Sequence, residues 1–389
     1  MEKRVVLKKH EDTRLLAGHQ WIFSNEIAHV EGIPAAGDVV EILSHDRQFL
    51  GLGFFNPHSL ISVRFLSPQR EEISQEFFER RIGDASTLRT QLFPGSEAYR
   101  LVNGESDFLP GLIIDKYNEY VSIQALSSGM DKRLNQICDV LESTLHPKAI
   151  IERNDSPLRA LEHLEERKGT LRGVAEHTIV SENGAKFNVD LLKGQKTGFF
   201  LDQRENRKRI RCHIGGADVL DCFCNEGGFS INASLGGANH VLGIDISDTA
   251  IERARVNSVI NQTNNIEFAQ GDVFDILKEY SAAGKRFDVV ILDPPSFTRS
   301  RKNVRSALKG YKTINGLALT IIREGGFLMT ASCSHHVTEE SFLETIDESS
   351  RRSGRKLRLL ELSGASPDHP VLVSMPETKY LKFAVFSVQ

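Results

Sequence analysis

Four aspartates fall where predicted strands end, and a pair of glycines follows the first of them. They are Asp221, Asp245, Asp272 and Asp293, and the loop after the first reads Cys222-Phe-Cys-Asn-Glu-Gly-Gly-Phe229. Ligands of open parallel sheets bind beyond the carboxyl ends of the strands, and glycine lets the backbone approach a ligand closely. Asp245 lies 24 residues after Asp221, near the roughly 20-residue spacing at which an acidic side chain accepts hydrogen bonds from ribose hydroxyls. The pattern predicts a site for a nucleoside-containing cofactor.

Nicotinamide dehydrogenases and S-adenosylmethionine (SAM) enzymes both use such a pattern. The loop lacks the full G-x-G-x-x-G spacing, and the fourth strand ends in Asp293-Pro-Pro-Ser-Phe297. Two prolines in succession fix the backbone and remove two amide donors. They would form a rigid shelf that presents Asp293 to a flat base, although a motif this short can also serve only to end a strand. We interpret the two features together as favouring SAM.

The elements that must position these aspartates alternate between strand and helix from about residue 185 to the end. Strands are predicted at 218–223, 240–245, 266–269, 287–293 and 326–330, with helices at about 228–236, 248–261, 273–281 and 307–323. Alternation of this kind predicts an α/β fold, with a parallel sheet covered by helices on both faces.

The chain before residue 185 has a different pattern. Residues 1–72 contain short apolar runs at 5–7, 38–43, 49–55 and 60–66, separated by Gly, Pro, Asn and His, which predicts a small β-barrel. Residues 73–93 have the spacing of an amphipathic linker helix. Strands at 111–115, 120–124 and 149–152 and a helix at 130–145 predict a central α+β domain that ends near residue 184.

The composition excludes several classes of protein. Hydrophobic residues make up 40% and charged residues 26% of 389 residues, with a net charge of -4, as in ordinary globular proteins. No apolar run reaches the length of about 18 residues that a transmembrane helix needs, and the first residues do not resemble a signal peptide. The five cysteines have neither disulfide-framework nor zinc-site spacing. We therefore expect a cytoplasmic protein without a metal site or a membrane partner.

Several motifs together resemble those of the large-subunit ribosomal RNA methyltransferases, and within them the branch that makes 5-methylcytosine. The C-terminal motifs are Lys196-Thr-Gly-Phe-Phe-Leu-Asp-Gln-Arg-Glu-Asn-Arg207, Val219-Leu-Asp-Cys-Phe223, Asp293-Pro-Pro-Ser-Phe297, Ala331-Ser-Cys-Ser-His-His336, Asp368-His-Pro-Val371, Pro376-Glu and Tyr380-Leu-Lys382. Arg14-Leu-Leu-Ala-Gly-His19, Trp21-Ile-Phe-Ser-Asn-Glu26 and Gly37-Asp-Val-Val40 are similar to the PUA domain of that family. The resemblance covers nearly the whole chain.

The resemblance implies a PUA barrel over 1–72, a linker helix and central α+β domain over 73–184, and a Rossmann-like SAM-dependent methyltransferase domain over 185–389. It implies that Asp221 and its loop hold the methionine end of SAM, Asp245 the ribose and Asp272 the adenine edge. The segment Leu201-Asp-Gln-Arg204 would pack over the cofactor, with Arg204 on its carboxylate. The full set of expected cofactor contacts is Asp202, Arg204, Asp221, Phe223, Asn225, Gly227, Asp245, Ile246, Asp272, Val273 and Asp293.

Methylation of cytosine at carbon 5 explains why a cysteine would be needed. Carbon 5 is a poor nucleophile until a thiolate adds to carbon 6, and a base must then remove the carbon-5 proton so that the thiol is expelled. Cys333 follows the last predicted strand and is the expected nucleophile. Some RNA cytosine-5 methyltransferases carry a second cysteine in the Asp-Pro-Pro loop, where this chain has Ser296. Asp293 is the preferred proton acceptor, ahead of His335 and His336.

Two basic runs begin beside the expected pocket. One holds six basic residues and no acidic one between Arg299 and Lys312, and the other holds five from Arg204 to Arg211 with only Glu205 against them. Lysine and arginine neutralise phosphates, and the target base must be unstacked or flipped to reach the methyl donor. The expected contacts with ribosomal RNA are Arg207, Pro295, Phe297, Arg299, Arg301, Lys302, Lys309 and Tyr311. Phe297 and Tyr311 would stack on the base unless they belong to the core, and each basic run also fits a solvated helix face.

Other functions remain open from the sequence. Methylation of a guanine nitrogen needs no covalent cysteine. A non-catalytic RNA-binding assembly factor would use the barrel alone, and a small-molecule methyltransferase would not need the two N-terminal parts. Related folds often dimerise, so a homodimer is also left open.

Overall fold

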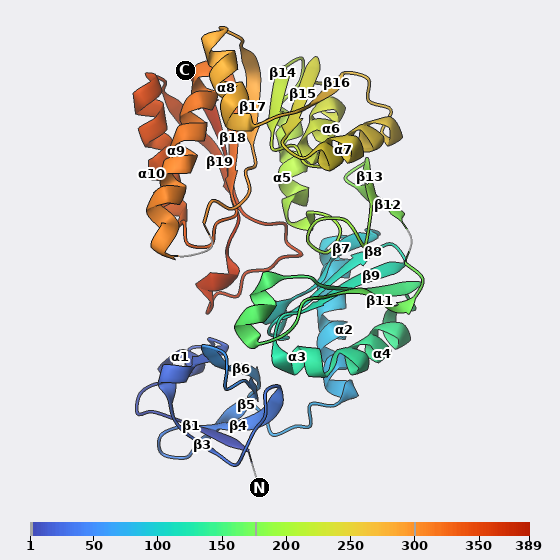
Figure 1. Ribbon diagram of the computed structural model, residues 1–389, viewed down its shortest axis with the longest axis vertical. Coiled ribbons are helices and arrows are strands. Elements are labelled where there is room, and N and C mark those ends of the chain that lie inside the picture. Colours follow the sequence, from blue (N-terminus) through green and yellow to red (C-terminus); the bar gives the residue numbers. More distant parts are fainter. Residues whose placement is uncertain (1–2, 176, 299–300) are drawn as a thin grey trace. The chain divides into compact units, whose positions relative to one another are not determined.

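The computed structural model describes residues 3–175, 177–298 and 301–389, and at position 301 the backbone only. The chain forms two compact units (Figure 1). Unit 1 comprises Met1–Val180, Val189–Leu201 and Pro367–Thr378, and unit 2 comprises Ser181–Asn188, Asp202–Ser366 and Lys379–Gln389. The first two predicted parts thus share one unit, which also takes in a segment from near the C-terminus. In the described residues no helix is both long and apolar enough to cross a membrane.

The first sheet of unit 1 has six strands in the order β2-β6-β5-β4-β1-β3. Their bounds are β1 Arg4–Leu7, β2 Trp21–Phe23, β3 Ile27–Glu31, β4 Asp38–Leu43, β5 Phe49–Phe55 and β6 Ile61–Ser67, with helix α1 at Thr13–Leu16. Val5, Ile42 and Val63 are buried in its core. The strands predicted from apolar runs are present, whereas β2 and β3 were missed because each is short and mostly not buried.

The second sheet of unit 1 has five strands in the order β11-β10-β9-β8-β7. The strands are β7 Ala98–Asn103, β8 Leu112–Tyr117, β9 Tyr120–Ala125, β10 Ala149–Asn154 and β11 Arg167–Gly173, and the helices are α2 Gln75–Leu92, α3 Ser128–Lys132 and α4 Leu134–Leu145. Phe77 of α2, Ile114 of β8 and Ile137 of α4 share one apolar core. A hairpin, β12 Thr178–Glu182 and β13 Ala185–Val189, follows where the chain passes into unit 2.

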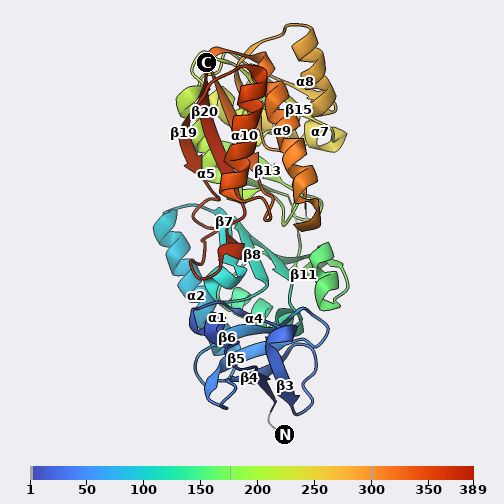
Figure 2. The same cartoon turned by 90° about the vertical axis from the view of Figure 1, so that its left-hand side faces the viewer.

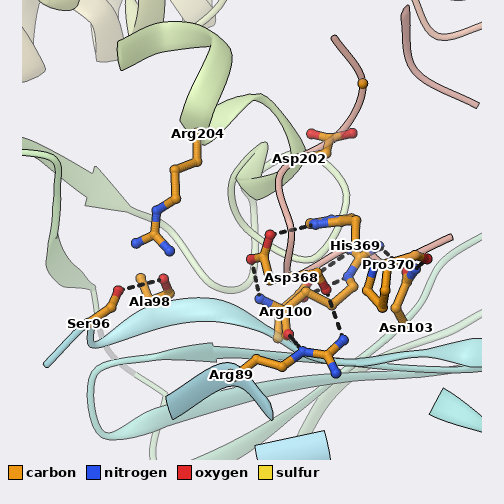
Figure 3. A network of polar contacts seen from close by, with 12 residues as sticks. Arg89, Ser96, Ala98, Arg100, Asn103, Asp202, Arg204, Asp368, His369 and Pro370 are labelled. Carbon is orange, nitrogen blue, oxygen red and sulfur yellow. Dashed lines mark hydrogen bonds and ion pairs between the residues drawn. The ribbon is translucent and has the colours of Figure 1, made fainter. Parts of the chain in front are cut away.

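The segment Pro367–Thr378 belongs to unit 1, where Figure 2 shows it in red beside the blue elements of that unit. Buried polar contacts hold it there (Figure 3). Arg89 forms an ion pair with Asp107, and its Nη2 also donates to the carbonyl of Asp368 at 2.9 Å. The Asp368 carboxylate accepts the backbone N–H of Arg100 at 2.9 Å and lies 2.9 Å from Nδ1 of His369. The Asp-His-Pro motif therefore anchors this returning segment, an arrangement that no local sequence pattern predicts.

Unit 2 is built on a seven-stranded sheet in the order β16-β15-β14-β17-β18-β20-β19. The strands are β14 Asp218–Cys222, β15 His240–Asp245, β16 Ile266–Gln270, β17 Phe287–Leu292, β18 Ile322–Ser332, β19 Leu357–Ser363 and β20 Lys382–Val388. The five predicted strands are parallel, but β20 runs antiparallel to both β18 and β19. The prediction of a wholly parallel sheet was wrong here, because the chain leaves β19, passes through residues 367–378 of unit 1 and returns as β20 between β18 and β19.

Helices cover both faces of this sheet, as the alternation predicts (Figure 1). They are α5 Arg204–Arg209, α6 Gly228–Leu235, α7 Asp248–Ile260, α8 Val273–Ala282, α9 Val304–Ile321 and α10 Glu339–Ser353. Successive strand residues point to opposite faces, so Leu220 packs in the core with α8, α9 and α10 and Val219 packs in the core with α6. The strand order reverses between β14 and β17, which places the ends of these two strands at the expected ligand site.

Candidate functional site

The loop after β14 has an unusual backbone. Phe223, Asn225 and Gly227 have positive φ angles of 64°, 48° and 80°. Left-handed conformations of non-glycine residues cost free energy and concentrate at functional sites. At Gly227 a Cβ would also lie only 3.1 Å from the ring of Phe268. The three predicted loop residues are thus the ones that shape this turn beyond the sheet edge.

Asp221 is fully buried at the end of β14. One carboxylate oxygen, Oδ2, accepts a hydrogen bond from Ser230 Oγ at 2.6 Å, whereas Oδ1 has no hydrogen-bond partner among the described residues. Burial raises the pKa of Asp221 to about 7, and the charges of Asp293 and Asp245 act in the same direction. A buried acceptor without a partner is costly, so this oxygen fits the ammonium group of a ligand.

Asp245 and Ile246 follow at the end of β15. The Asp245 carboxylate accepts backbone N–H groups from Asn225 at 3.0 Å and Ser247 at 2.9 Å, so its orientation is fixed. Each oxygen keeps capacity for a ligand hydroxyl. The Ile246 side chain is 65% exposed. An oriented carboxylate beside an exposed apolar side chain suits a ribose and a flat purine.

Asp272 and Val273 have local roles in the fold. The Asp272 carboxylate caps helix α8 by accepting the N–H groups of Phe274 at 2.8 Å and Asp275 at 3.3 Å. The Val273 side chain is buried in the apolar core. Any adenine contact by Val273 would therefore use its main chain.

Asp202 and Arg204 are both buried near the start of α5. The carboxylate of Asp202 accepts a hydrogen bond from the hydroxyl of Tyr380 at 2.6 Å. Arg204 Nε lies 4.0 Å from Glu182 Oε2. The resemblance implies that both residues contact the cofactor, and this stays a prediction. In the structure, Asp202 already accepts a hydrogen bond from Tyr380, and Arg204 lies beside the carboxylate of Glu182.

The basic run from Arg204 to Arg211 is not a basic surface. Arg207, expected to contact RNA, is buried and binds Glu182 through two hydrogen bonds of 2.7 Å. Arg211 donates to the side chain of Asn232, and Arg209 pairs with Glu361. The prediction for Arg207 was wrong, because charge counts along a helix do not show which side chains face the interior.

The second basic run differs. Lys302, Arg305 and Lys309 are exposed on and before α9, whereas Lys312 pairs with Glu348 of α10. Arg299 and the side chain of Arg301 lie outside the described residues. This run presents a positive surface in unit 2.

Two aromatic residues were expected to stack on the target base. Tyr311 is fully buried, its hydroxyl lies 3.0 Å from Ser334 Oγ, and its ring centroid lies 4.6 Å from that of Phe297. The prediction for Tyr311 was wrong, since it is a core residue. Phe297 is half-buried against Tyr311 and Phe274, and Pro295 is exposed.

Cys333 directly follows β18 and is partly exposed. Its Sγ lies 4.0 Å from the carbonyl oxygen of Pro294, in the loop that follows Asp293. The Asp293 carboxylate accepts a hydrogen bond from Gln203 Nε2 at 3.0 Å, and Gln203 is held in turn by Asn206 at 2.7 Å. The fold thus brings the predicted nucleophile to the loop of the predicted proton acceptor.

The other four cysteines lie in different surroundings. Cys138, Cys222 and Cys224 are buried, and burial raises the pKa of each thiol, to about 11 for Cys138 and well above the ordinary value for the other two. Thiols of this kind are inert. Cys212 is exposed in the segment that follows α5. Of the partly or fully exposed thiols, Cys333 is the one beside the Asp-Pro-Pro loop.

Sequence reasoning gave no individual role to three polar residues around this site. Gln203 and Asn206 orient Asp293, and the buried Lys382 donates to the carbonyl oxygen of Ser334 at 2.8 Å. Lys382 could have been singled out in the sequence, because it is a charged residue directly before the apolar run Phe383-Ala-Val-Phe386. Gln203 and Asn206 had no signal beyond the motif that contains them.

Comparisons with known proteins identify two domain types in this chain. Residues 5–68 match a PUA-like domain, and residues 162–383 match an S-adenosylmethionine-dependent methyltransferase. The chain is 40% identical to ribosomal RNA large subunit methyltransferase I of Aeromonas salmonicida over 97% of both chains, and 39% identical to the protein of that name from Pseudoalteromonas atlantica over 100% of both.

Among solved structures, a Streptococcus mutans protein described as a SAM-dependent methyltransferase has the same fold, with a TM-score of 0.85 and 23% identity over the whole of both chains. SMU.776, described as a methyltransferase complexed with SAH, has a TM-score of 0.87, again at 23% identity over the whole of both chains. The protein is a SAM-dependent methyltransferase, and it belongs to the family of ribosomal RNA large subunit methyltransferase I, with a PUA-like domain at its N-terminus.

Proposed function

We propose that this enzyme methylates carbon 5 of a cytosine in large-subunit ribosomal RNA, in the cytoplasm, through a covalent bond to Cys333. The ribosomal RNA substrate follows from the names of relatives that align over almost the full chain. The choice of cytosine carbon 5 rests on one observation: a partly exposed thiol lies at the carboxyl edge of the sheet, 4.0 Å from the Pro294 carbonyl. A guanine-nitrogen methyltransferase would have no use for that thiol.

The cofactor site fits the methionine end of SAM. Asp221 offers a buried carboxylate oxygen that has no hydrogen-bond partner among the described residues. Asp245 offers a carboxylate whose orientation is fixed by two backbone hydrogen bonds. Asp221 would receive the ammonium group and Asp245 the ribose hydroxyls, with Ile246 against the adenine. When bound, SAM supplies a methyl group on a positively charged sulfur.

The chain's own residues would carry the remaining steps. The Cys333 thiolate adds to carbon 6, and the electron pair of the carbon 5–carbon 6 bond becomes available at carbon 5 for attack on the methyl group. Asp293, held by Gln203 at 3.0 Å, then accepts the carbon-5 proton. The electrons of the broken C–H bond restore the ring double bond and expel the thiolate, so Cys333 is regenerated.

Substitution of Cys333 tests the proposal directly. C333A should lose at least about 10³-fold in turnover, as expected when a covalent nucleophile is removed, and should still bind S-adenosylhomocysteine. C212A is the matched control, because Cys212 is the exposed thiol among the five cysteines, and it should keep normal activity. The assay uses labelled SAM, unmodified large-subunit RNA and identification of the labelled nucleoside. Label in 5-methylcytosine supports the proposal.

Two outcomes would contradict it. Label in a methylated guanine, with normal turnover by C333A, would establish the guanine-nitrogen reaction. Absence of both SAM binding and labelling would favour an RNA-binding assembly factor. RNA that carries 5-fluorocytosine adds a second readout, because the carbon-5 fluorine cannot leave as a proton would and the Cys333 adduct should persist through denaturing electrophoresis.

A further inference from the structure

Lys382 is a charged residue in the interior of unit 2. It opens β20, is 3% exposed, and its Nζ donates hydrogen bonds of 2.8 Å to the carbonyl oxygens of Ser334, Val337 and Tyr380. These bonds satisfy all three N–H donors of an ammonium group. Carbonyl groups do not neutralise its charge, however, and a buried charge without a counter-ion is costly. The site therefore favours an anion nearby.

The position of Lys382 ties it to the segment that carries Cys333. In the antiparallel ladder between β18 and β20, Lys382 is the partner of Ser332, and its Nζ holds the carbonyl of Ser334. Lys382 thus contacts the residues on both sides of Cys333, through the strand pairing with Ser332 and the hydrogen bond to Ser334. A further bond to Val337 fixes the end of the same loop.

We propose that Lys382 is a positioning residue that holds the Cys333 loop at the sheet edge and stabilises the thiolate form of Cys333. This role in catalysis rests on the proposed function, in which Cys333 is the nucleophile. The thiolate, not the thiol, is the reactive species, and an adjacent cation favours it. A buried lysine acts more strongly than an exposed one because water and salt screen it less.

Other titratable groups face the same loop. Asp293 opposes a second negative charge, and burial raises the pKa of Tyr311, which keeps this phenol neutral. Glu339 of α10 and Lys379 pair with each other at 2.7 Å near the surface, and His335 of the loop itself lies against Tyr380. Burial lowers the pKa of Lys382 to about 8, and the thiolate of Cys333 opposes that change. The lysine therefore carries its charge, and supports the thiolate, below about pH 8.

The test measures the pKa of the Cys333 thiol rather than activity. In a full-length C212S background, Cys333 is the accessible thiol, because the other three cysteines are buried. The rate of alkylation by iodoacetamide is followed from pH 5.5 to 9.5, with peptide mass spectrometry to locate the modification. We expect K382M to raise the apparent pKa of this thiol by about one unit or more, as removal of a close opposite charge does. K382R should keep the parental curve.

Lys379 provides a matched control three positions away. Its side chain is 51% exposed and paired with Glu339, so K379M should leave the alkylation curve almost unchanged. An unchanged curve for K382M, with native circular dichroism and normal binding of S-adenosylhomocysteine, would overturn the proposal. If K382M does not fold, the C212S protein provides the test by itself. Its Cys333 thiol must have a lower pKa in the native state than in urea, and an equal or higher native pKa would refute the proposal.

The two proposals fail in different ways. An inactive C333A together with an unchanged thiol pKa in K382M leaves the nucleophile in place and removes the role of Lys382. Normal turnover by C333A removes the proposed function, and with it any catalytic role for Lys382, whatever the thiol pKa.

Discussion

The buried carboxylate of Asp221 predicts that the affinity for the cofactor depends on pH. Burial raises the pKa of Asp221 to about 7, so the protein without ligand holds a neutral carboxyl group at pH 6. An ammonium group requires the ionised form. Because ligand binding and loss of the proton are then coupled, the affinity must fall as the pH drops below the pKa of the free protein.

The size of the effect follows from the fraction of Asp221 that is ionised. Below pH 7 the dissociation constant should rise by about tenfold for each pH unit, and from pH 7.5 to 5.5 by about 25-fold in all. At pH 6 binding should release close to one proton. Ser230 donates to Asp221 at 2.6 Å and helps to keep the pKa from rising further. S230A should therefore move the midpoint of the profile to higher pH.

Isothermal titration calorimetry with S-adenosylhomocysteine over this pH range provides the measurement, and two buffers of different ionisation enthalpy report the proton released. D221N should bind weakly and without this pH dependence. A dissociation constant that varies by less than about threefold for the unaltered protein would refute the reasoning, because a group with a pKa near 7 must change the affinity more than that. The same profile in D221N would show that another group titrates.

Four further predictions follow from particular contacts. D221N should raise the stability of the ligand-free protein at pH 8 by up to about 4 kcal/mol, measured by thermal unfolding at several pH values, because the folded state holds the Asp221 proton up to about pH 7 and loses stability as the pH rises above the ordinary value of 3.8; equal stability at pH 8 would contradict it. R207M should destabilise by about 3–5 kcal/mol in urea unfolding, since it leaves Glu182 buried without its two hydrogen bonds, whereas a marginal change would contradict a stabilising role for this ion pair. The double variant K302A/K309A should lower the slope of log affinity for RNA against log salt by about 0.7 for each charge removed. K312A is the control, because Lys312 is paired with Glu348, and it should change the slope less. R89M should lower the free energy of unfolding by about 3–5 kcal/mol, because it leaves the buried carboxylate of Asp107 without its ion-pair partner. It should also speed proteolysis in residues 367–378, and an unchanged digestion pattern would show that other contacts hold the segment.

Much of the fold could be predicted from the sequence because its signals are local. The strands β4, β5 and β15 end where the apolar runs end, and the strand–helix alternation identified the parallel part of the sheet. The last two strands, β19 at the sheet edge and β20 beside it, were missed, and β20 departs from the alternation because it follows β19 without an α-helix between them. The homodimer stays a prediction, to be checked by light scattering.

The candidate site divides in the same way. The positions of Asp221, Asp245 and Asp293 at the sheet edge could be predicted from the sequence, because each lies at or next to the end of an apolar strand. Their roles stay predictions. Arg207 and Tyr311 were misplaced, because whether a side chain faces solvent or core depends on partners distant in sequence, here Glu182 and Ser334.

The sequence by itself determined the strand–helix alternation of the parallel part of the sheet, the acidic strand ends, the glycine-containing loop after the first of them and the family. Each of these depends on residues close together along the chain, whose conformations follow from local sterics and apolar periodicity. Only the tertiary structure decided that Lys382 holds the segment around Cys333, that Gln203 orients Asp293, and that residues 367–378 return to unit 1. The physical reason is that a buried charge must find its partners wherever the packed chain supplies them, and the chain supplies these from positions up to hundreds of residues apart.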